Sequence, residues 1–570
     1  NRVRMTRMFS TGYAAIEPVK GLKLKETLSY DYTIQKDSRY YNPLSSAGPK
    51  SGSDAQTAKG FIEYGKLISS TSLNYVHTFA HKHHLNVLAA YEIESYQTDH
   101  ASGEKSKLPS DKLTEPDNAA VLNSFKSATQ AYRMISYLSR LNYDYDDRYY
   151  IAGSYRRDGS SRLSPNNRWG NFWSVSGMWH LGNENFMKAV KPVLSDVKIR
   201  ASYGVNGNQP GSYYGYKGLY SYGENYMEAA GSYESSQPND LLTWEKNYSL
   251  NLGIDLSFIN RIFASLEYYN RDTKDLLYSL PISATTGFTS YLSNIGRLNN
   301  KGIEFELRTL NVVSNDFNWT SVFNLSHNRN KIVSLNGLLD QTIEGTWFIH
   351  KVGLPYHTFY VKEFAGVDPQ TGYAQYYLNT KNEDGSYNRE LTTDADKAES
   401  IPYKTATPKV SGGFTNILNY KWIDLTFTLT YSLGGYSFDK LGTYIENGTS
   451  SIYSSRYNLP AYMMNRWQNP GDQTDIPRFV YNESATSTNS SRYIHSTDHL
   501  RLKNFTLGFT LPNQWTQKLM IDKVRIYFSG NNLLTWAKWK QYDPETPVNG
   551  EVFCEAPAMR TFSFGAQLSF

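Results

Sequence analysis

The feature that most constrains this sequence is a two-residue alternation of apolar and polar side chains that recurs along the chain. Within the last twelve residues, Met559 to Phe570, an apolar residue recurs at every second position, at Phe562, Phe564, Ala566, Leu568 and Phe570, with Ser, Gly and Gln between them. Successive side chains of a strand lie on opposite faces, so this segment has one apolar and one polar face. A soluble β-sandwich uses the same pattern, and one such strand does not decide the fold class.

The repetition of this pattern favours a barrel. Leu250 to Tyr268 predicts a hairpin that turns at Ile259 to Arg261, and Trp422 to Leu433 alternates without interruption. No helical layer or second sheet is predicted to cover the apolar faces. We therefore expect an all-β fold, a transmembrane antiparallel β-barrel with about seventeen strands in this chain, short periplasmic turns and long extracellular loops.

Composition agrees with this expectation. The mean hydropathy is −0.56, and the apolar runs are far shorter than the roughly 20 residues that a membrane-spanning helix needs. The 58 basic and 53 acidic residues give a net charge of +5, without a basic stretch containing interleaved aromatics, so nucleic acid is not expected as a partner. The single cysteine, Cys554, excludes an internal disulfide.

The beginning of the chain already reads as a strand. Asn1 to Val19 mixes apolar and polar residues, without the charged and apolar regions of a signal peptide. A barrel cannot leave an open edge in lipid, so we expect a signal peptide and further strands upstream. Residues 333–408 are predicted to form an extracellular loop subdomain, because the strand signal at Phe359 to Phe364 lies among loop signals.

No set of acid, base and nucleophile with meaningful spacing is found, so neither an enzyme nor a cofactor is expected. The histidines at 77, 81, 83 and 84 include His81 and His83, which would share a strand face. A polar turn explains this group better than a metal site, and no metal is predicted.

Aromatic loop residues are the candidate ligand-binding groups. They are Tyr213, Tyr214, Tyr216 and Tyr220, together with Trp347 in a second loop. Tyrosine offers an apolar ring face and a hydrogen-bonding hydroxyl to a sugar ring or a peptide side chain. The alternative is that these rings pack on each other or on a protein lid.

Several motifs resemble the SusC/RagA family of TonB-dependent outer-membrane transporters of Bacteroides-type bacteria. They keep the family's order along nearly the whole chain: RRDGSSRLSPNNRWGNFWSVSGMW (156–179), KIRASYGVNGNQ (198–209), YYNRDTKDLLYSLPI (268–282), NIGRLNNKGIE (294–304), FAGVDPQTG (364–372), NRWQNPGDQTDIPR (465–478), LRLKNFTLGFTLP (500–512), RIYFSGNNLLTW (525–536) and the terminal RTFSFGAQLSF.

The resemblance implies a barrel of 22 strands in the full protein, with a plug domain and a TonB box upstream of residues 1–570. It also implies contact with TonB through that upstream part, a SusD-like surface lipoprotein as a lid, and a dimer of such pairs in the outer membrane. Phe570 resembles the terminal aromatic signal that barrel-assembly machinery reads.

The function expected from the resemblance is TonB-dependent import of a nutrient oligomer, an oligosaccharide first and a peptide second, capped by the lipoprotein. The alternatives from other classes are a passive porin or surface adhesin without energy coupling, and a soluble carbohydrate-binding sandwich. An upstream plug would exclude the porin, and extraction only by detergent would exclude the sandwich.

Overall fold

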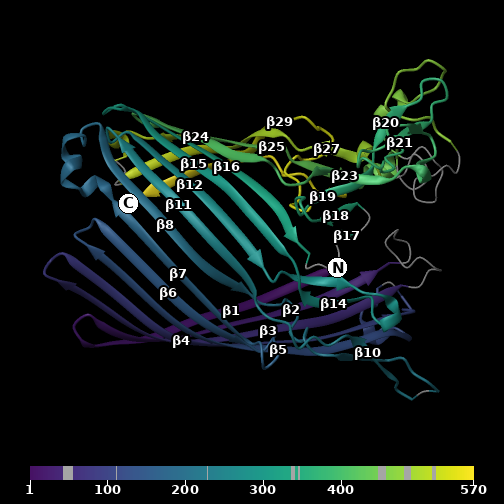
Figure 1. The fold of residues 1–570 in the computed structure, drawn as a ribbon, viewed down its shortest axis with the longest axis horizontal. Helices are drawn as coiled ribbons and strands as arrows, with labels where there is room; N and C mark the ends of the chain where they lie inside the picture. The colour runs from purple at the N-terminus through teal and green to yellow at the C-terminus, as the bar shows by residue number, and fades with distance from the viewer. Residues whose placement is uncertain are drawn as a thin grey trace. The chain divides into compact units, whose positions relative to one another are not determined.

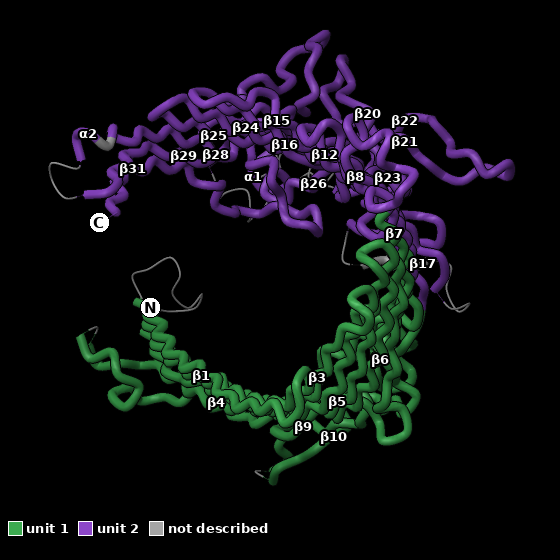
Figure 2. The backbone as a smooth tube through the Cα atoms, turned by 90° about the vertical axis from the view of Figure 1, so that its left-hand side faces the viewer, with its two compact units in different colours: residues 1–180, 200–250, 273–295 green, residues 181–199, 251–272, 296–570 purple. Residues whose placement is uncertain are grey.

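The computed structural model describes residues 1–42, 55–110, 112–227, 229–335, 341–344, 347–446, 458–480, 489–516 and 521–569. These residues fall into two compact units, shown in green and purple in Figure 2. Unit 1 comprises residues 1–180, 200–250 and 273–295, and unit 2 comprises residues 181–199, 251–272 and 296–570. Within the described residues, seventeen strands belong to the largest sheet, which agrees with the predicted number.

Unit 1 is built on seven long strands that pair in chain order, each antiparallel to the next (Figure 1). They are β1 (Arg2–Val19), β2 (Leu22–Tyr41), β3 (Gln56–Phe79), β4 (His83–Ser106), β5 (Val121–Tyr145), β6 (Tyr149–Ser160) and β7 (Trp169–His180). Gly21, at φ 85°, occupies a left-handed position in the turn between β1 and β2, where glycine carries no steric cost.

The pairing register of unit 1 separates its two faces. On one face, Leu24 lies opposite Leu73, and Tyr91 lies opposite Tyr137. On the other face, Lys66 is paired with both Asp31 and Tyr96. The face that carries Leu24 and Tyr91 continues through exposed apolar side chains such as Leu141, Ile151 and Val175. The alternation predicted from the sequence therefore gives unit 1 one apolar face and one polar face.

Unit 2 contains a second run of strands, paired antiparallel in chain order. They are β15 (Arg297–Val313), β16 (Phe317–Ser334), β24 (Val410–Tyr420), β25 (Ile423–Leu433), β28 (His499–Thr510), β29 (Lys523–Ala537) and β31 (Thr561–Ser569). Three further strands, β8 (Leu194–Asn208), β11 (Glu245–Phe258) and β12 (Ile262–Lys274), have residues in both units.

The apolar residues of unit 2 are aligned across neighbouring strands. Leu425 pairs with Leu507, Leu507 with Phe528, and Phe528 with Phe564. In its pairing with β25, strand β28 has one extra residue between Leu502 and Asn504, which forms a β-bulge there. The apolar residues have even numbers before the bulge, at Leu500 and Leu502, and odd numbers after it, at Phe505 and Leu507. The bulge keeps them all on one face.

Smaller sheets complete unit 2. The first sheet has four strands: β17 (Gln341–Glu344), β18 (Phe348–Lys351), β19 (Thr358–Lys362) and β23 (Ser400–Thr405). The second sheet has three strands: β20 (Phe364–Val367), β21 (Ala374–Tyr377) and β22 (Leu391–Thr392). The third sheet also has three: β26 (Tyr436–Asp439), β27 (Ile494–Ser496) and β30 (Glu551–Val552). The region 333–408 thus has its own β-structure, and its extracellular position stays a prediction.

The loop boundaries differ from those read in the sequence. The charged, proline-containing sequence from Asp99 to Gln130 predicts one long loop, yet β4 and β5 pair from His83 to Ser106 and from Val121 to Tyr145. In these outer strand ends the large apolar residues are Val121, Leu122 and Phe125, whose spacing does not alternate, while the backbone pairing of β4 and β5 continues. Between β7 and β8 the chain forms a short 3₁₀ helix at Asn185–Ala189.

Within the described part of the chain, no helix has the length and apolar character that crossing a bilayer requires. Phe570, predicted as the assembly signal, lies outside the described residues.

Candidate functional site

Tyr213 lies on the polar face of unit 1, in a stack of aromatic rings. Its ring centroid is 6.1 Å from that of Tyr96 on β4 and 5.7 Å from that of Tyr132 on β5. The Arg162 guanidinium lies over the rings of Tyr132 and Tyr213, at 4.0 and 4.7 Å from their centroids. Such cation–π contacts fix the loop that carries Tyr213 against the strands.

Buried polar groups support this stack from below. The Tyr132 hydroxyl donates a hydrogen bond to Glu94, and the Glu94 carboxylate pairs with Lys66 at 3.0 Å. The Ala131 backbone N–H donates to the Tyr214 hydroxyl at 3.1 Å. Tyr213 and Tyr214 therefore have defined positions before any ligand binds.

The other two tyrosines of the predicted set have different surroundings. Tyr216 packs against the buried cluster of Leu163, Phe172, Val205, Leu242 and Trp244. Tyr220 lies on β9 (Leu219–Tyr222), which pairs with β10 (Ser232–Ser236), and its side chain is 60% exposed. The structure brings Tyr213 and Tyr214 together, and leaves Tyr220 as the exposed ring of the four.

Trp347 lies in unit 2, where its indole is packed. The ring stacks on Phe438 at 4.8 Å, and Nε1 donates to the Glu551 carboxylate at 3.1 Å. The Lys440 ammonium lies over the same ring at 5.0 Å. These contacts attach Trp347 to the core formed around Phe359, Val361 and Tyr493.

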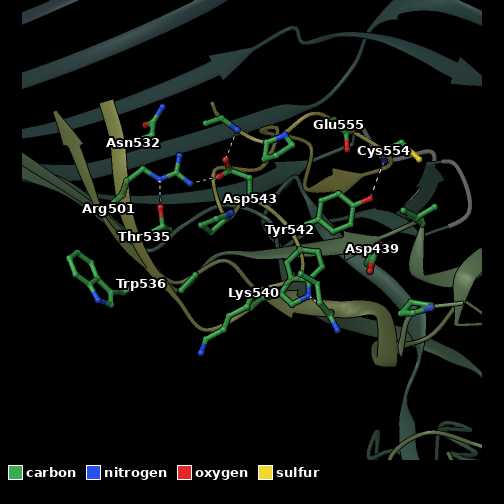
Figure 3. Close-up of a pocket in the computed structure, with 18 of the residues that line it drawn as sticks. Asp439, Arg501, Asn532, Thr535, Trp536, Lys540, Tyr542, Asp543, Cys554 and Glu555 are labelled. Carbon is green, nitrogen blue, oxygen red and sulfur yellow. Dashed lines mark hydrogen bonds and ion pairs between the residues drawn. The ribbon is translucent and has the colours of Figure 1, made fainter. Parts of the chain in front are cut away.

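A cavity of about 1250 Å³ in unit 2 was not anticipated from the sequence (Figure 3). It opens between the ends of β28 and β29 and the segment 538–560. Arg501 on β28 and Thr535 on β29 form one side, and Tyr542 and Asp543 approach from that segment. The lining combines cations, carboxylates and aromatic rings.

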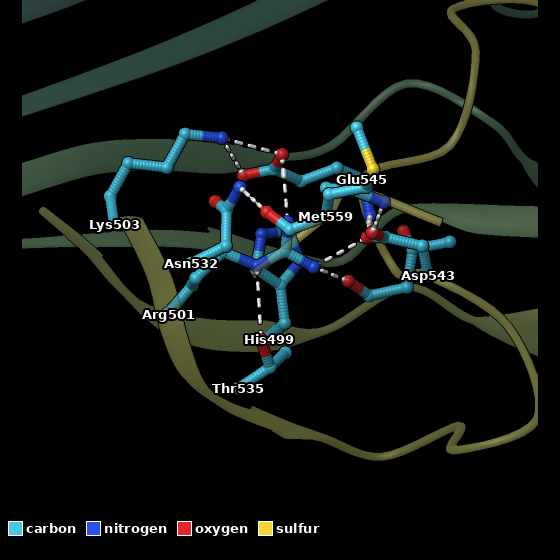
Figure 4. Close-up of polar contacts among 10 residues, drawn as sticks. His499, Arg501, Lys503, Asn532, Thr535, Asp543, Glu545 and Met559 are labelled. Carbon is cyan, nitrogen blue, oxygen red and sulfur yellow. Dashed lines mark hydrogen bonds and ion pairs between the residues drawn. The ribbon is translucent and has the colours of Figure 1, made fainter. Parts of the chain in front are cut away.

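Arg501 holds this segment against the strands (Figure 4). Its side chain is 3% exposed; Nε donates to the Thr535 hydroxyl at 3.1 Å, and Nη1 lies 3.0 Å from the Glu545 carboxylate. Nη2 contacts Asp543, whose second oxygen accepts the Ala558 backbone N–H at 2.8 Å. Burial alone would raise the pKa of Asp543, but Arg501 and backbone N–H donors together hold it below its ordinary value.

Aromatic side chains form a second wall of the cavity. Trp539, only 6% exposed, stacks on His495 at 4.5 Å and lies 5.3 Å from the ring of Tyr542. The Cys554 backbone N–H donates to the Tyr542 hydroxyl at 3.1 Å, which fixes that ring. Burial raises the pKa of Asp439, at the far side of the cavity, to about 6.

Lys540 and Arg560 extend the cavity lining with exposed cationic side chains. Neither makes an ion pair with any part of the chain that the structure describes. Fixed aromatic faces next to free hydrogen-bond donors suit the reversible binding of a polar oligomer, which needs no covalent step.

The histidine-rich turn groups different residues from those considered in the sequence. His84, Asp144 and Asp147 bring ligand atoms within 4.8 Å of one another. His83 instead contacts the Tyr143 hydroxyl at 2.7 Å, and His81 lies in the turn at φ 58°. His84 and the two carboxylates form a group that could hold a cation.

The fold and its relatives define the class of this protein. The family model described as TonB dependent receptor-like, beta-barrel, matches residues 4–533, and the chain belongs to this family of outer-membrane transporters, which are not enzymes. Within it, the predicted membership of the SusC/RagA group is confirmed.

Three known proteins are similar to this chain over most of its length. The chain is 30% identical to TonB-dependent receptor P3 of Formosa agariphila, over 98% of this chain and 57% of that protein. It is 32% identical to TonB-dependent receptor SusC of Bacteroides thetaiotaomicron, over 80% of this chain and 45% of SusC. The solved structure of the RagAB peptide transporter matches 100% of this chain and 62% of its own, with a TM-score of 0.88 and 28% identity. The chain thus spans about half the length of the curated relatives it matches.

Proposed function

We propose that this chain is the barrel portion of a SusC-like transporter that imports a nutrient oligomer across the outer membrane. The observation that carries the proposal is the match along nearly the whole chain to TonB-dependent receptors, SusC among them. The substrate class is an oligosaccharide or a peptide; the likeness to the RagAB peptide transporter favours the peptide as a second candidate.

The proposal includes the parts that the resemblance implies. A plug and a TonB box precede this chain, and TonB supplies the energy. A SusD-like lipoprotein covers the extracellular mouth, and two such pairs form a dimer in outer-membrane lipid.

The ligand contacts proposed for this chain are aromatic. Tyr220 presents an exposed ring, whereas Tyr213, Tyr214 and Tyr216 shape the surface beside it. In unit 2, the cavity beside Tyr542 offers the same chemistry, and Trp347 stabilises the neighbouring core.

Uptake by cells that express the full-length protein with its lipoprotein tests the function. Fluorescent oligosaccharides and fluorescent peptides of matched size are the probes. We expect uptake of one class, and its loss when TonB is deleted. Uptake that persists without TonB would instead support a passive porin, and surface binding without uptake would support an adhesin.

A further inference from the structure

A groove of about 690 Å³ lies on the apolar face of unit 1, near the ends of β1 to β5. It is at the end of the strands where the connections are long, residues 42–55 and 107–120, opposite the tight turns at Gly21 and His81. In outer-membrane barrels the long connections are extracellular. The groove therefore belongs to the level of the outer leaflet.

Two phenylalanine rings and small residues shape the groove. Phe61 pairs with Ala101, and Phe125 pairs with Gly103, so each ring stands beside a small residue on the same face. A Cβ atom at Gly103 would be 3.6 Å from the Phe125 ring. Phe61 and Phe125 are 40% and 69% exposed, and they extend the apolar face that Leu24 and Leu73 begin.

Four cations lie on this same face. Arg4 on β1 lies directly opposite Lys36 on β2. Arg2 lies opposite Ser38, and Ser38 in turn lies opposite Lys59 on β3. In the described residues, Arg2, Arg4 and Lys36 form no ion pair, whereas Lys59 pairs with Glu115. Like charges directly opposite on neighbouring strands destabilise a sheet. An anion between Arg4 and Lys36 would remove that repulsion.

We propose that this groove binds the phosphate-bearing headgroup of an outer-leaflet lipid. The phosphate lies between Arg4 and Lys36, where Arg offers paired N–H donors and Lys a point charge. The acyl chains follow Phe61 and Phe125 onto the apolar face. Asp37 and Glu63 also line the groove, so its charge is not uniformly positive. We place the anion between Arg4 and Lys36 because these two cations lie directly opposite each other. The proposal rests on the membrane location of the family and not on the transported substrate.

The test measures lipid retained by the full-length protein, purified in mild detergent and analysed by native mass spectrometry. The probes are a two-chain lipid with a phosphomonoester headgroup and its phosphate-free analogue. We expect the wild-type protein to bind the phosphorylated lipid, and Arg4→Gln with Lys36→Gln to bind it about 30-fold more weakly, since each cation near an anionic surface contributes about fivefold. Arg39→Gln is the matched control, because Arg39 is an exposed cation on the polar face of the same end of β2.

Lys36→Glu separates binding from folding. This substitution places a carboxylate opposite Arg4, so it removes the repulsion in the sheet and also the phosphate site. We expect unchanged or improved thermal stability together with lost lipid binding. Equal retention by all variants, equal loss in the Arg39→Gln control, or equal binding of the phosphate-free analogue would each overturn the proposal. Displacement of the lipid by inorganic phosphate alone would show a free-anion site and would also overturn it.

Discussion

The small sheet of β26, β27 and β30 contains two titratable groups whose contributions to stability oppose each other. Asp439 on β26 is 4% exposed, and burial raises its pKa from 3.8 to about 6. His495 on β27 stacks on Trp539, and burial together with Arg492 lowers its pKa from 6.5 to about 4. Both groups change their charge between pH 4 and 6.5.

The two signs follow from linkage. The folded state binds a proton at Asp439 more readily than the unfolded chain does, so this group stabilises the sheet below pH 4, and the effect is lost as the pH rises through 6. The neutral His495 stabilises the sheet above pH 6.5, and this effect is lost as the pH falls toward 4. At 1.36 kcal/mol for each pH unit, each contribution amounts to about 3 kcal/mol, so the two nearly cancel.

Hydrogen exchange of peptides covering residues 436–446 and 494–497 measures the opening of this sheet. We expect the wild-type opening equilibrium to change by less than about tenfold between pH 6.5 and 4, after correction for intrinsic exchange. In His495→Gln, Asp439 is the one of these two groups that still titrates, so opening of the sheet becomes about 100-fold less favourable as the pH falls. In Asp439→Asn, His495 is the one of these two groups that still titrates, so opening of the sheet becomes about 100-fold more favourable as the pH falls. Single variants that stay flat, or that change in the same direction, would refute this account of the two buried groups.

Three further outcomes are expected. Arg501→Met leaves the Asp543 carboxylate buried without its partner, which costs about 3–5 kcal/mol. We expect residues 538–558 to exchange hydrogen faster than in the wild type, and an unchanged exchange rate would contradict this cost. Gly372→Ala forces a Cβ atom to 2.3 Å from the Trp467 ring at a φ of 73°, so the full-length protein should lose about 1–3 kcal/mol of stability in a thermal unfolding experiment; an unchanged Tm would argue against this close contact. Tyr220→Ala removes an exposed ring and should weaken ligand binding about tenfold in calorimetry with the transported oligomer, without a change in Tm; unchanged affinity would remove Tyr220 from the proposed ligand contacts.

Strands were predictable where one face is apolar. Trp422 to Leu433 was expected from alternation alone, and the structure has a strand at Ile423–Leu433. The boundaries were wrong between Asp99 and Gln130, where large apolar residues are few and do not alternate. There the hydrogen-bonded ladder maintains the strand, and no local pattern reports it.

The candidate site was less predictable than the fold. Arg501 and Asp543 are separated by 42 residues and meet through the loop after β29, so no spacing in the sequence joins them. Two acidic residues at Asp543 and Glu545, matching two cations at Arg501 and Lys503, were the available signal. The sequence places Tyr213 among the predicted ligand-binding tyrosines, but the stacking of its ring on Tyr96 and Tyr132 depends on the fold.

The bulge in β28 allows this strand to hold one residue more than its neighbour β25. Without Lys503, the segment from Leu500 to Phe509 would keep one uninterrupted phase of apolar and polar residues. The added residue changes that phase, and the bulge absorbs the change, so no apolar side chain turns toward the polar side. A lysine that pairs with Glu545 at 2.7 Å is thereby accommodated. Single-residue insertions in a strand of this fold can therefore add a charged group to the polar face while the apolar face stays intact.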